Sequence, residues 1–225
     1  MSRFPARNRV PEFAVFAPLL RMTTKYGFPD IYEALVEELR GAYPAQWEDF
    51  EKAQVLGEDI FGEPKPHPNA VLNLFLEQRI KWASPFAAYR AGLGTPSSLA
   101  SDEPDTILPR PTLASIIHGM GEIRRVTTVA AHGIVYVGNP GACLEEVCAL
   151  NTGINRTEQR LEVLNKIYNV MIERNEGDML SPPPLRNLVC VDCAKRLETI
   201  HLNWRKRFFW IRLPRLLGWS NWEGV

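Results

Sequence analysis

Apolar side chains along this chain recur at intervals of three and four residues, the spacing of α-helices that bury one face. The clearest case is the segment 29–44, PDIYEALVEELRGAYP, which we predict to be a helix. One side of that helix collects four apolar residues, Ile31, Ala34, Leu35 and Leu39. Asp30 is placed to cap its start, and Gly41 is placed to end it.

The segment 12–26 also has helical spacing, but a proline falls inside the pattern. Its apolar residues are Phe13, Phe16, Leu20 and Tyr26, and the proline is Pro18. An interior proline removes one backbone hydrogen bond and costs about 3 kcal/mol. We therefore predict a helix that is kinked at Pro18 or that begins just before it.

Further helices are predicted from the same spacing and from capping residues. The segments are 45–62, ended by Gly57 or Gly62; 68–76, opened by Pro68 and Asn69; 84–93, capped by Ser84 and Pro85; 113–123; and 155–172, with Asn155 and Glu158 as a capping box. EPKPHP at 63–68 predicts a rigid linker, and the polar, proline-rich run 94–111 predicts an exposed, mobile loop. Only GIVYVG at 133–138 has the composition of a strand.

The last long helix is predicted over residues 190–212. At about 100° per residue its apolar residues form one stripe, which we expect to be the buried face. The stripe consists of Leu197, Ile200, Trp204, Phe208 and Ile211. Together these patterns predict a mainly α protein without an internal repeat.

Composition limits the class of protein without naming an activity. The 225 residues, 45% of them hydrophobic and 23% charged, are enough for one large or two small globular domains. No apolar run approaches the ~20 residues of a membrane helix, and FAVFAPLL at 13–20 is not read as a signal peptide because Arg21 and Lys25 follow it closely. We predict an intracellular protein, cytoplasmic or nuclear, whose cysteines are thiols or metal ligands rather than disulfides.

The net charge is zero, but the charges are unevenly placed along the chain. Nine acidic residues lie from Glu33 to Glu63, against Arg40 and Lys52. Eight basic residues lie from Arg186 to Arg215, against Asp192 and Glu198. The two regions are therefore able to attract each other within one molecule.

The four cysteines form two close pairs, Cys143 with Cys148 and Cys190 with Cys193, separated by 41 residues. Two pairs of thiolates are the ligand set of a structural tetrahedral zinc site, so one structural zinc is predicted. The site requires a turn within 143–148, because residues five apart on a helix point about 140° away from each other. The alternative is that the cysteines are small buried apolar side chains.

Three other kinds of site were weighed. A thiol-redox centre at Cys190 and Cys193 lacks the βαβ frame that such centres use. Nucleic-acid binding is an alternative that rests on Arg205, Lys206 and Arg207, which are interleaved with aromatic residues. Catalysis has no motif, because the four histidines are scattered, although His201 is an alternative zinc ligand to one of the cysteines. The histidines are His67, His118, His132 and His201.

The order of segments resembles a known family. FAVFAPLLRMTTKYGFPDIYEALVEELRGAYP, then VLNLFLEQRIKWASPFAAYRAGL, a C-x4-C segment and CVDCAKRLETIHLNWRKRFFWIRLPRLLGW together resemble the fungal BTB/POZ domain proteins, from about Phe13 to Trp222. The resemblance implies the last helices of a BTB domain followed by a helical region and a C-x2-C tail. It implies protein–protein interaction as the role, but it carries over neither the family's dimerisation surface nor its cullin-adaptor role, which need the rest of that domain.

We therefore predict a non-catalytic interaction or scaffold protein with an unknown protein partner. Its predicted organisation is an irregular helical array in three parts. These are the BTB-end helices over 1–45, a helical middle over 46–135 with the exposed loop 94–111, and a cysteine-containing helical unit over 136–225.

Overall fold

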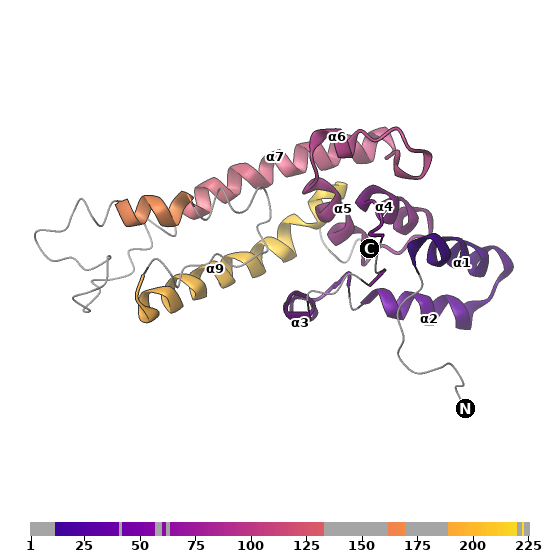
Figure 1. Ribbon diagram of the computed structural model, residues 1–225, viewed down its shortest axis with the longest axis horizontal. Coiled ribbons are helices and arrows are strands. Elements are labelled where there is room, and N and C mark those ends of the chain that lie inside the picture. The colour runs from indigo at the N-terminus through magenta and orange to yellow at the C-terminus, as the bar shows by residue number, and fades with distance from the viewer. Residues whose placement is uncertain are drawn as a thin grey trace, which may run out of the picture. The chain divides into compact units, whose positions relative to one another are not determined.

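The computed structural model describes residues 12–40, 42–56, 60–61, 64–132, 162–169, 189–219 and 222. Within these residues every regular element is helical, as the apolar spacing predicted (Figure 1). The longer helices are α1 (Phe13–Tyr26), α2 (Pro29–Arg40), α3 (Trp47–Leu56), α4 (Pro68–Glu77), α5 (Ser84–Gly92), α7 (Arg110–His132) and α9 (Val191–Arg212). Shorter ones are α6 (Pro96–Leu99), η1 (Pro104–Thr106) and η4 (Pro214–Leu217), and residues 162–169 are also helical. The strand-like segment 133–138 lies outside the described residues.

Internal contacts divide the chain into two compact units. The first consists of Met1–Ile116 together with Leu213–Val225, and the second consists of Ile117–Arg212. This division does not follow the three predicted parts, because the last residues of the chain belong with the first unit and α7 contributes to both.

In the first unit, α1 and α2 form a helical hairpin (Figure 1). α1 runs through Pro18, so the predicted start just before that proline is wrong. Gly27 ends α1 in the left-handed conformation (φ 69°), and its N–H donates to the Thr23 carbonyl. A glycine is suited to this position because a Cβ would strain the backbone there.

The start and the buried face of α2 differ from the sequence prediction. α2 begins at Pro29, so Asp30 lies in its first turn rather than at the cap. A carboxylate in the first turn is still favourable beside the positive end of the helix dipole. Leu39 is buried, but Ile31, which was predicted on the same buried face, is exposed.

Aromatic rings fill much of the core of the first unit. Phe61 meets Phe13 and Phe16 edge-on, with ring centroids 5.1 and 5.3 Å apart. Tyr43 meets Phe75 edge-on at 4.8 Å, and Trp47 at the start of α3 lies 5.1 Å from Phe50. Such ring pairs contribute about 0.5–1.5 kcal/mol each beyond the apolar area that they bury.

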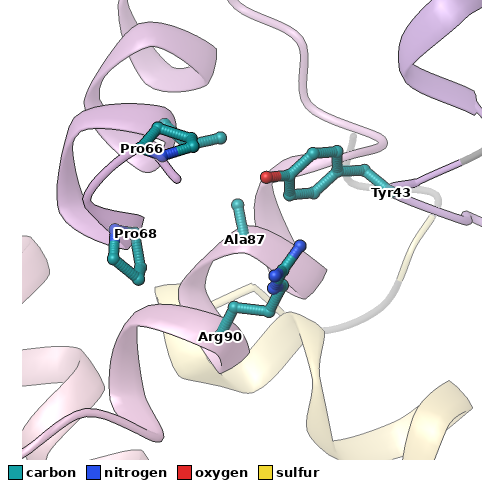
Figure 2. A pocket seen from close by; sticks show the side chains of 6 residues that line it. Tyr43, Pro66, Pro68, Ala87 and Arg90 are labelled. Atoms are coloured by element: carbon teal, nitrogen blue, oxygen red, sulfur yellow. The ribbon is translucent and has the colours of Figure 1, made fainter. Parts of the chain in front are cut away.

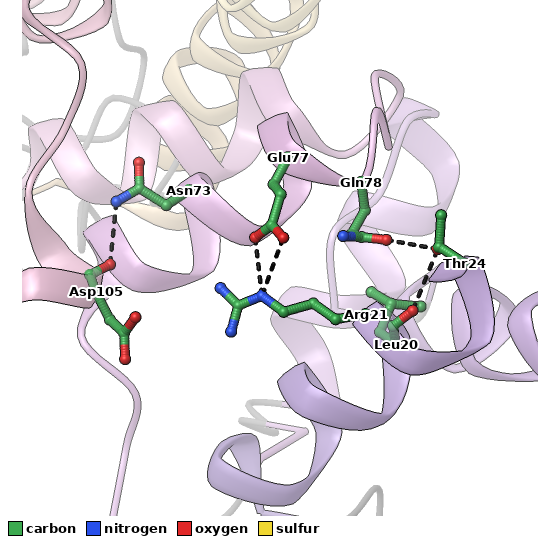
Figure 3. A network of polar contacts seen from close by, with 7 residues as sticks. All are labelled: Leu20, Arg21, Thr24, Asn73, Glu77, Gln78 and Asp105. Carbon is green, nitrogen blue, oxygen red and sulfur yellow. Dashed lines mark hydrogen bonds and ion pairs between the residues drawn. The ribbon is translucent and has the colours of Figure 1, made fainter. Parts of the chain in front are cut away.

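Polar contacts join α1 to α4 (Figure 3). The Nε of Arg21 donates to both carboxylate oxygens of Glu77, at 2.9 and 3.2 Å. The Thr24 hydroxyl contacts the Gln78 side-chain oxygen at 2.6 Å. These contacts are exposed, so each contributes little to stability, but they place the hairpin in register along α4.

Two asparagines of α4 hold the segment that was predicted to be an exposed, mobile loop. The Asn69 amide donates to the carbonyls of Ser98, Leu99 and Thr106 at 3.1–3.2 Å. The Asn73 amide donates to the carbonyls of Asp105 and Ile107 at 3.0 and 2.9 Å. Residues 94–111 thus contain two short helices, α6 and η1, and bury Leu99, Thr106 and Leu108. Most of its residues are exposed, as predicted, but side chains of α4 satisfy several of its backbone carbonyls, and its mobility stays a prediction.

In the second unit, α9 runs antiparallel to the part of α7 that follows Ile116 (Figure 1). Ala131, at the end of α7, shares an apolar cluster with Cys193 and Leu197 near the start of α9. Arg212, at the other end of α9, lies near enough to Glu122 of α7 for its positive charge to act on that carboxylate. The helix over 162–169 adds Leu164 and Ile167 to the cluster.

The buried face of α9 is only partly the predicted one. Leu197 and Phe208 are buried as predicted, whereas Ile200 and Trp204 are half-buried and Ile211 is exposed. His201 and Arg205 are buried in their place. At about 100° per residue, the observed face is rotated by roughly 60° from the predicted apolar stripe.

Candidate functional site

The predicted zinc ligands are only partly within the described residues. Cys190 is half-buried directly before α9, and Cys193 is buried in its first turn. Cys193 packs with Ala131, Leu164 and other apolar side chains. Cys143 and Cys148 lie outside the described residues. In the described part of the chain, no group of three or more His, Cys, Asp or Glu residues is placed to hold a metal ion, and the four-cysteine zinc site remains a prediction.

The three basic residues of the nucleic-acid hypothesis do not share one surface. Arg205 is buried, Lys206 is half-buried and Arg207 is exposed. Consecutive residues of a helix point about 100° apart, so the three side chains leave α9 in different directions. A phosphate-binding surface needs several cations on one solvated face, and Arg205 is not placed to contribute to one.

His201 is a buried ionisable group on α9. Burial, followed by the nearby charge of Arg205, lowers the pKa of His201 from 6.5 to about 4. Within the described part of the chain, its Nε2 has no hydrogen-bond partner. The imidazole is therefore neutral near pH 7, and it lies on the buried face of α9 between Leu197 and Arg205.

A small pocket lies in the first unit near the start of α4 and along α5 (Figure 2). Its lining residues are Tyr43, Pro66, Pro68, Val71, Ala87 and Arg90. The Arg90 guanidinium lies over the Tyr43 ring, 5.7 Å from its centroid. The cavity volume is about 20 Å³, which is room for about one water molecule, whereas cofactor and drug-sized sites measure about 300–1,000 Å³.

Among the residues that the structure describes, the largest group of exposed apolar side chains is on the α1–α2 hairpin. Val15, Leu19, Met22 and Tyr26 follow one another at intervals of four, three and four residues, so they form a single stripe along α1. Phe28, just after Gly27, and Ile31, in the first turn of α2, are also exposed. These side chains are between 36% and 58% exposed. We call the set Val15, Leu19, Met22, Tyr26, Phe28 and Ile31 the hairpin patch.

Charges surround the hairpin patch unevenly. α2 presents a row of exposed carboxylates, Asp30, Glu33, Glu37 and Glu38. Glu37 is paired with Arg40 at 2.8 Å. On α1, Arg21 is engaged by Glu77, and the Lys25 ammonium lies 5.3 Å from the centroid of the Tyr26 ring. The outward surface of the hairpin is thus apolar on α1 and acidic on α2.

The sequence prediction missed the hairpin patch because α1 is apolar on two sides. The expected face, Phe16 and Leu20, is buried, whereas Tyr26 from the same prediction is exposed. The signal was the second run of apolar residues at helical spacing, from Val15 to Tyr26. A helix with two apolar sides can bury one of them against its own chain and leave the other at the surface.

Comparisons of this chain with protein-family models, with curated proteins and with solved structures found no match. The resemblance to the fungal BTB/POZ proteins therefore stays a hypothesis. Among the described helices, none combines the length and the apolarity needed to cross a membrane.

Proposed function

We propose that this chain is a non-catalytic interaction protein, and that the hairpin patch is its docking surface. The observation that carries the proposal is the stripe of Val15, Leu19, Met22 and Tyr26, extended by Phe28 and Ile31, on the outside of a packed helical hairpin. Single exposed apolar side chains are ordinary on protein surfaces. Four along one face of a helix, with two more at the start of the next helix, are not, and apolar patches commonly mark interaction sites.

The chemistry of the hairpin patch supports docking of a protein. Tyrosine, phenylalanine and methionine are enriched at protein interfaces, and the aromatic rings bury a large area at a modest cost in side-chain entropy. Each Å² of apolar surface that a partner covers contributes about 25 cal/mol. The hairpin is held in the first unit by the buried side chains of Phe16 and Leu20, so the patch is presented on a packed support.

The proposal includes three finer features from the sequence. The chain is a member of the fungal BTB/POZ type, it works inside the cell in the cytoplasm or the nucleus, and its four cysteines form one structural zinc site. Its partner is a protein rather than a membrane or a nucleic acid.

No observation favours the two alternatives. A nucleic-acid interface at Arg205, Lys206 and Arg207 would lose one of its three cations to burial. A redox cysteine needs a partly exposed, electropositive surrounding, whereas Cys193 is packed among apolar side chains.

The test compares proteins retained by the wild-type chain with those retained by Val15→Asp and Met22→Asp, from an extract of the source cells. Val129→Asp is the matched control, because Val129 is an exposed valine on α7, outside the hairpin. The proposal predicts at least one protein that is lost about tenfold or more with both hairpin variants and kept with the control. If every retained protein is unaffected by the hairpin variants, the patch is not a docking surface.

A further inference from the structure

The carboxylates of α2 form a second surface feature beside the hairpin patch. Asp30, Glu33 and Glu37 follow one another at intervals of three and four residues, so they lie on one side of the helix, and Glu38 is also exposed. No cation in the described part of the chain forms an ion pair with Asp30, Glu33 or Glu38. The same hairpin therefore carries an exposed apolar stripe on α1 and exposed carboxylates on α2 that form no ion pair within the described residues.

The apolar stripe on α1 is long enough to contact about three turns of a partner helix. From Val15 to Tyr26 the stripe covers twelve residues, a length of about 16 Å at a rise of 1.5 Å per residue. Two packed helices leave a groove and ridges into which the side chains of a third helix fit, and apolar anchors at i, i+3, i+4 and i+7 are the usual form of such docking.

From the apolar stripe and the acidic row together we infer that the hairpin patch receives an amphipathic helix of a partner protein, whose apolar face is bordered by lysine or arginine. The inference rests on the proposed docking function and specifies the partner's chemistry. The partner's apolar side chains cover Leu19 and Met22, while its cations meet the carboxylates of Asp30, Glu33 and Glu38. Complementary charges at the rim of an interface raise the association rate and reject partners of the wrong sign.

Charge argues against three other occupants. In a symmetric contact with a second copy, the same surface is used twice, so two acidic rows would be brought to one interface. An anionic lipid surface repels carboxylates. A nucleic-acid backbone does the same, because its phosphates need cations.

The experiment uses two synthetic helical peptides of about 18 residues. They share one leucine face, and their remaining positions carry lysine in one peptide and glutamate in the other. Binding to the full chain is measured by fluorescence anisotropy at low salt.

Three proteins are compared with wild type. One is Val15→Asp with Met22→Asp; the second is Asp30→Asn with Glu33→Gln and Glu38→Gln; the third, a matched control for the carboxylates, is Glu48→Gln with Asp102→Asn and Glu103→Gln, all exposed positions elsewhere in the first unit.

The inference predicts that the lysine peptide binds at least about tenfold more tightly than the glutamate peptide. The stripe variant should abolish binding, the α2 variant should remove the preference for lysine, and the control variant should keep both. Equal binding of the two peptides, lost in the stripe variant, would overturn the inferred partner chemistry and leave the docking function intact.

Two further outcomes would also overturn the inference. Binding that is unaffected by the stripe variant would remove both the partner chemistry and the proposed function. A concentration-dependent dimer of the wild type that is lost with Val15→Asp and kept with Val129→Asp would assign the patch to a second copy instead.

Discussion

His201 is a histidine that the fold keeps uncharged near neutral pH. Its pKa is lowered from 6.5 to about 4, mainly by burial and further by the neighbouring Arg205 charge. Between these two values the unfolded chain binds a proton at this site and the folded chain does not, so acid favours unfolding. The unfolding free energy is therefore unaffected by His201 protonation above pH 6.5, and it decreases as the pH falls from 6.5 toward 4.

We predict that acidification from pH 7 to pH 4 costs the wild type about 3 kcal/mol of unfolding free energy through His201. His201→Gln, which has no proton to gain, should lack this part of the pH dependence. Urea unfolding at a series of pH values measures it. His118→Gln, at an exposed position of α7, is the control and should behave as the wild type does. Parallel pH profiles for the wild type and His201→Gln would show that the imidazole is already solvated.

Asn69 is predicted to be the more important of the two asparagines that hold residues 94–111. Its amide is buried and donates to three carbonyls, whereas that of Asn73 is exposed and donates to two. Removing a donor from buried carbonyls leaves them unsatisfied, at about 1–3 kcal/mol, whereas water replaces an exposed donor. Asn69→Ala should therefore lower the unfolding free energy by about 2–3 kcal/mol, and Asn73→Ala by less than about 1 kcal/mol.

Hydrogen exchange provides a second measurement for the asparagine prediction. Asn69→Ala should increase the exchange of backbone amides within 96–107, while amides of α1 keep their wild-type rates. Equal losses of stability for Asn69→Ala and Asn73→Ala would mean that burial of the amide is not what determines its contribution.

At the scale of elements, the same substitution should have opposite effects at two glycines. Gly27 closes α1 with φ 69°, whereas Gly121 lies inside α7, and an added Cβ would meet no atom within 4 Å at either position. Steric space therefore does not distinguish the two positions, and the backbone conformation determines the sign of the stability change. Gly27→Ala should destabilise by about 1 kcal/mol because a Cβ disfavours the left-handed region. Gly121→Ala should stabilise by about 0.5–1 kcal/mol because alanine is the better helix former.

Thermal unfolding of the two variants measures this difference. Gly27→Ala should lower the Tm and Gly121→Ala should raise it. A neutral Gly27→Ala would indicate that the turn between α1 and α2 takes another conformation in solution, and the orientation of Phe28 would then change with it.

Helix positions were predictable from the sequence, but which side of a helix is buried was predictable only in part. Periodicity places α2 and α4 within a few residues because apolar spacing and proline starts are local signals. On α9, the most apolar stripe includes Ile200 and Trp204, yet packing buries His201 and Arg205. Local pattern cannot foresee this, because the cost of burying a polar side chain is offset by contacts with residues far away in sequence.

The same limit applied to the candidate site. The stripe from Val15 to Tyr26 is visible in the sequence, but α1 has a second apolar face in Phe16 and Leu20, and only the packing against Phe61 shows which of the two is buried. The hydrogen bonds from Asn69 to residues 94–111 were not predicted for a related reason. An asparagine at a helix start is equally consistent with a local capping role.

At the scale of the whole molecule, the two-unit organisation depends on contacts between distant parts of the sequence. η4 packs against α5, and Pro214 and Leu216 are buried, so the residues after α9 belong to the first unit. Nothing in the periodicity of the last residues identifies that partner. The three predicted parts are continuous in sequence, whereas the first observed unit combines residues from both ends of the chain.

The zinc prediction also concerns the whole molecule, because it requires 143–148 and 190–193 to meet. Cys190 and Cys193 flank the start of α9 three residues apart, a spacing that allows both thiolates to reach one ion. Protein purified without added metal should contain one zinc per chain, and all four thiols should resist modification under native conditions.

Serine substitutions separate zinc binding from simple burial of the cysteines. If zinc holds the four thiolates, Cys143→Ser, Cys148→Ser, Cys190→Ser and Cys193→Ser should each remove the metal and destabilise the chain by similar amounts. If the cysteines are only apolar side chains, Cys193→Ser should destabilise, because it buries a hydroxyl in the cluster with Leu197, and the half-buried Cys190→Ser should have little effect. Metal content together with urea unfolding of Cys190→Ser therefore distinguishes zinc binding from simple burial of the cysteines. A metal-free wild type with reactive thiols and an unchanged Cys190→Ser variant would exclude the zinc site.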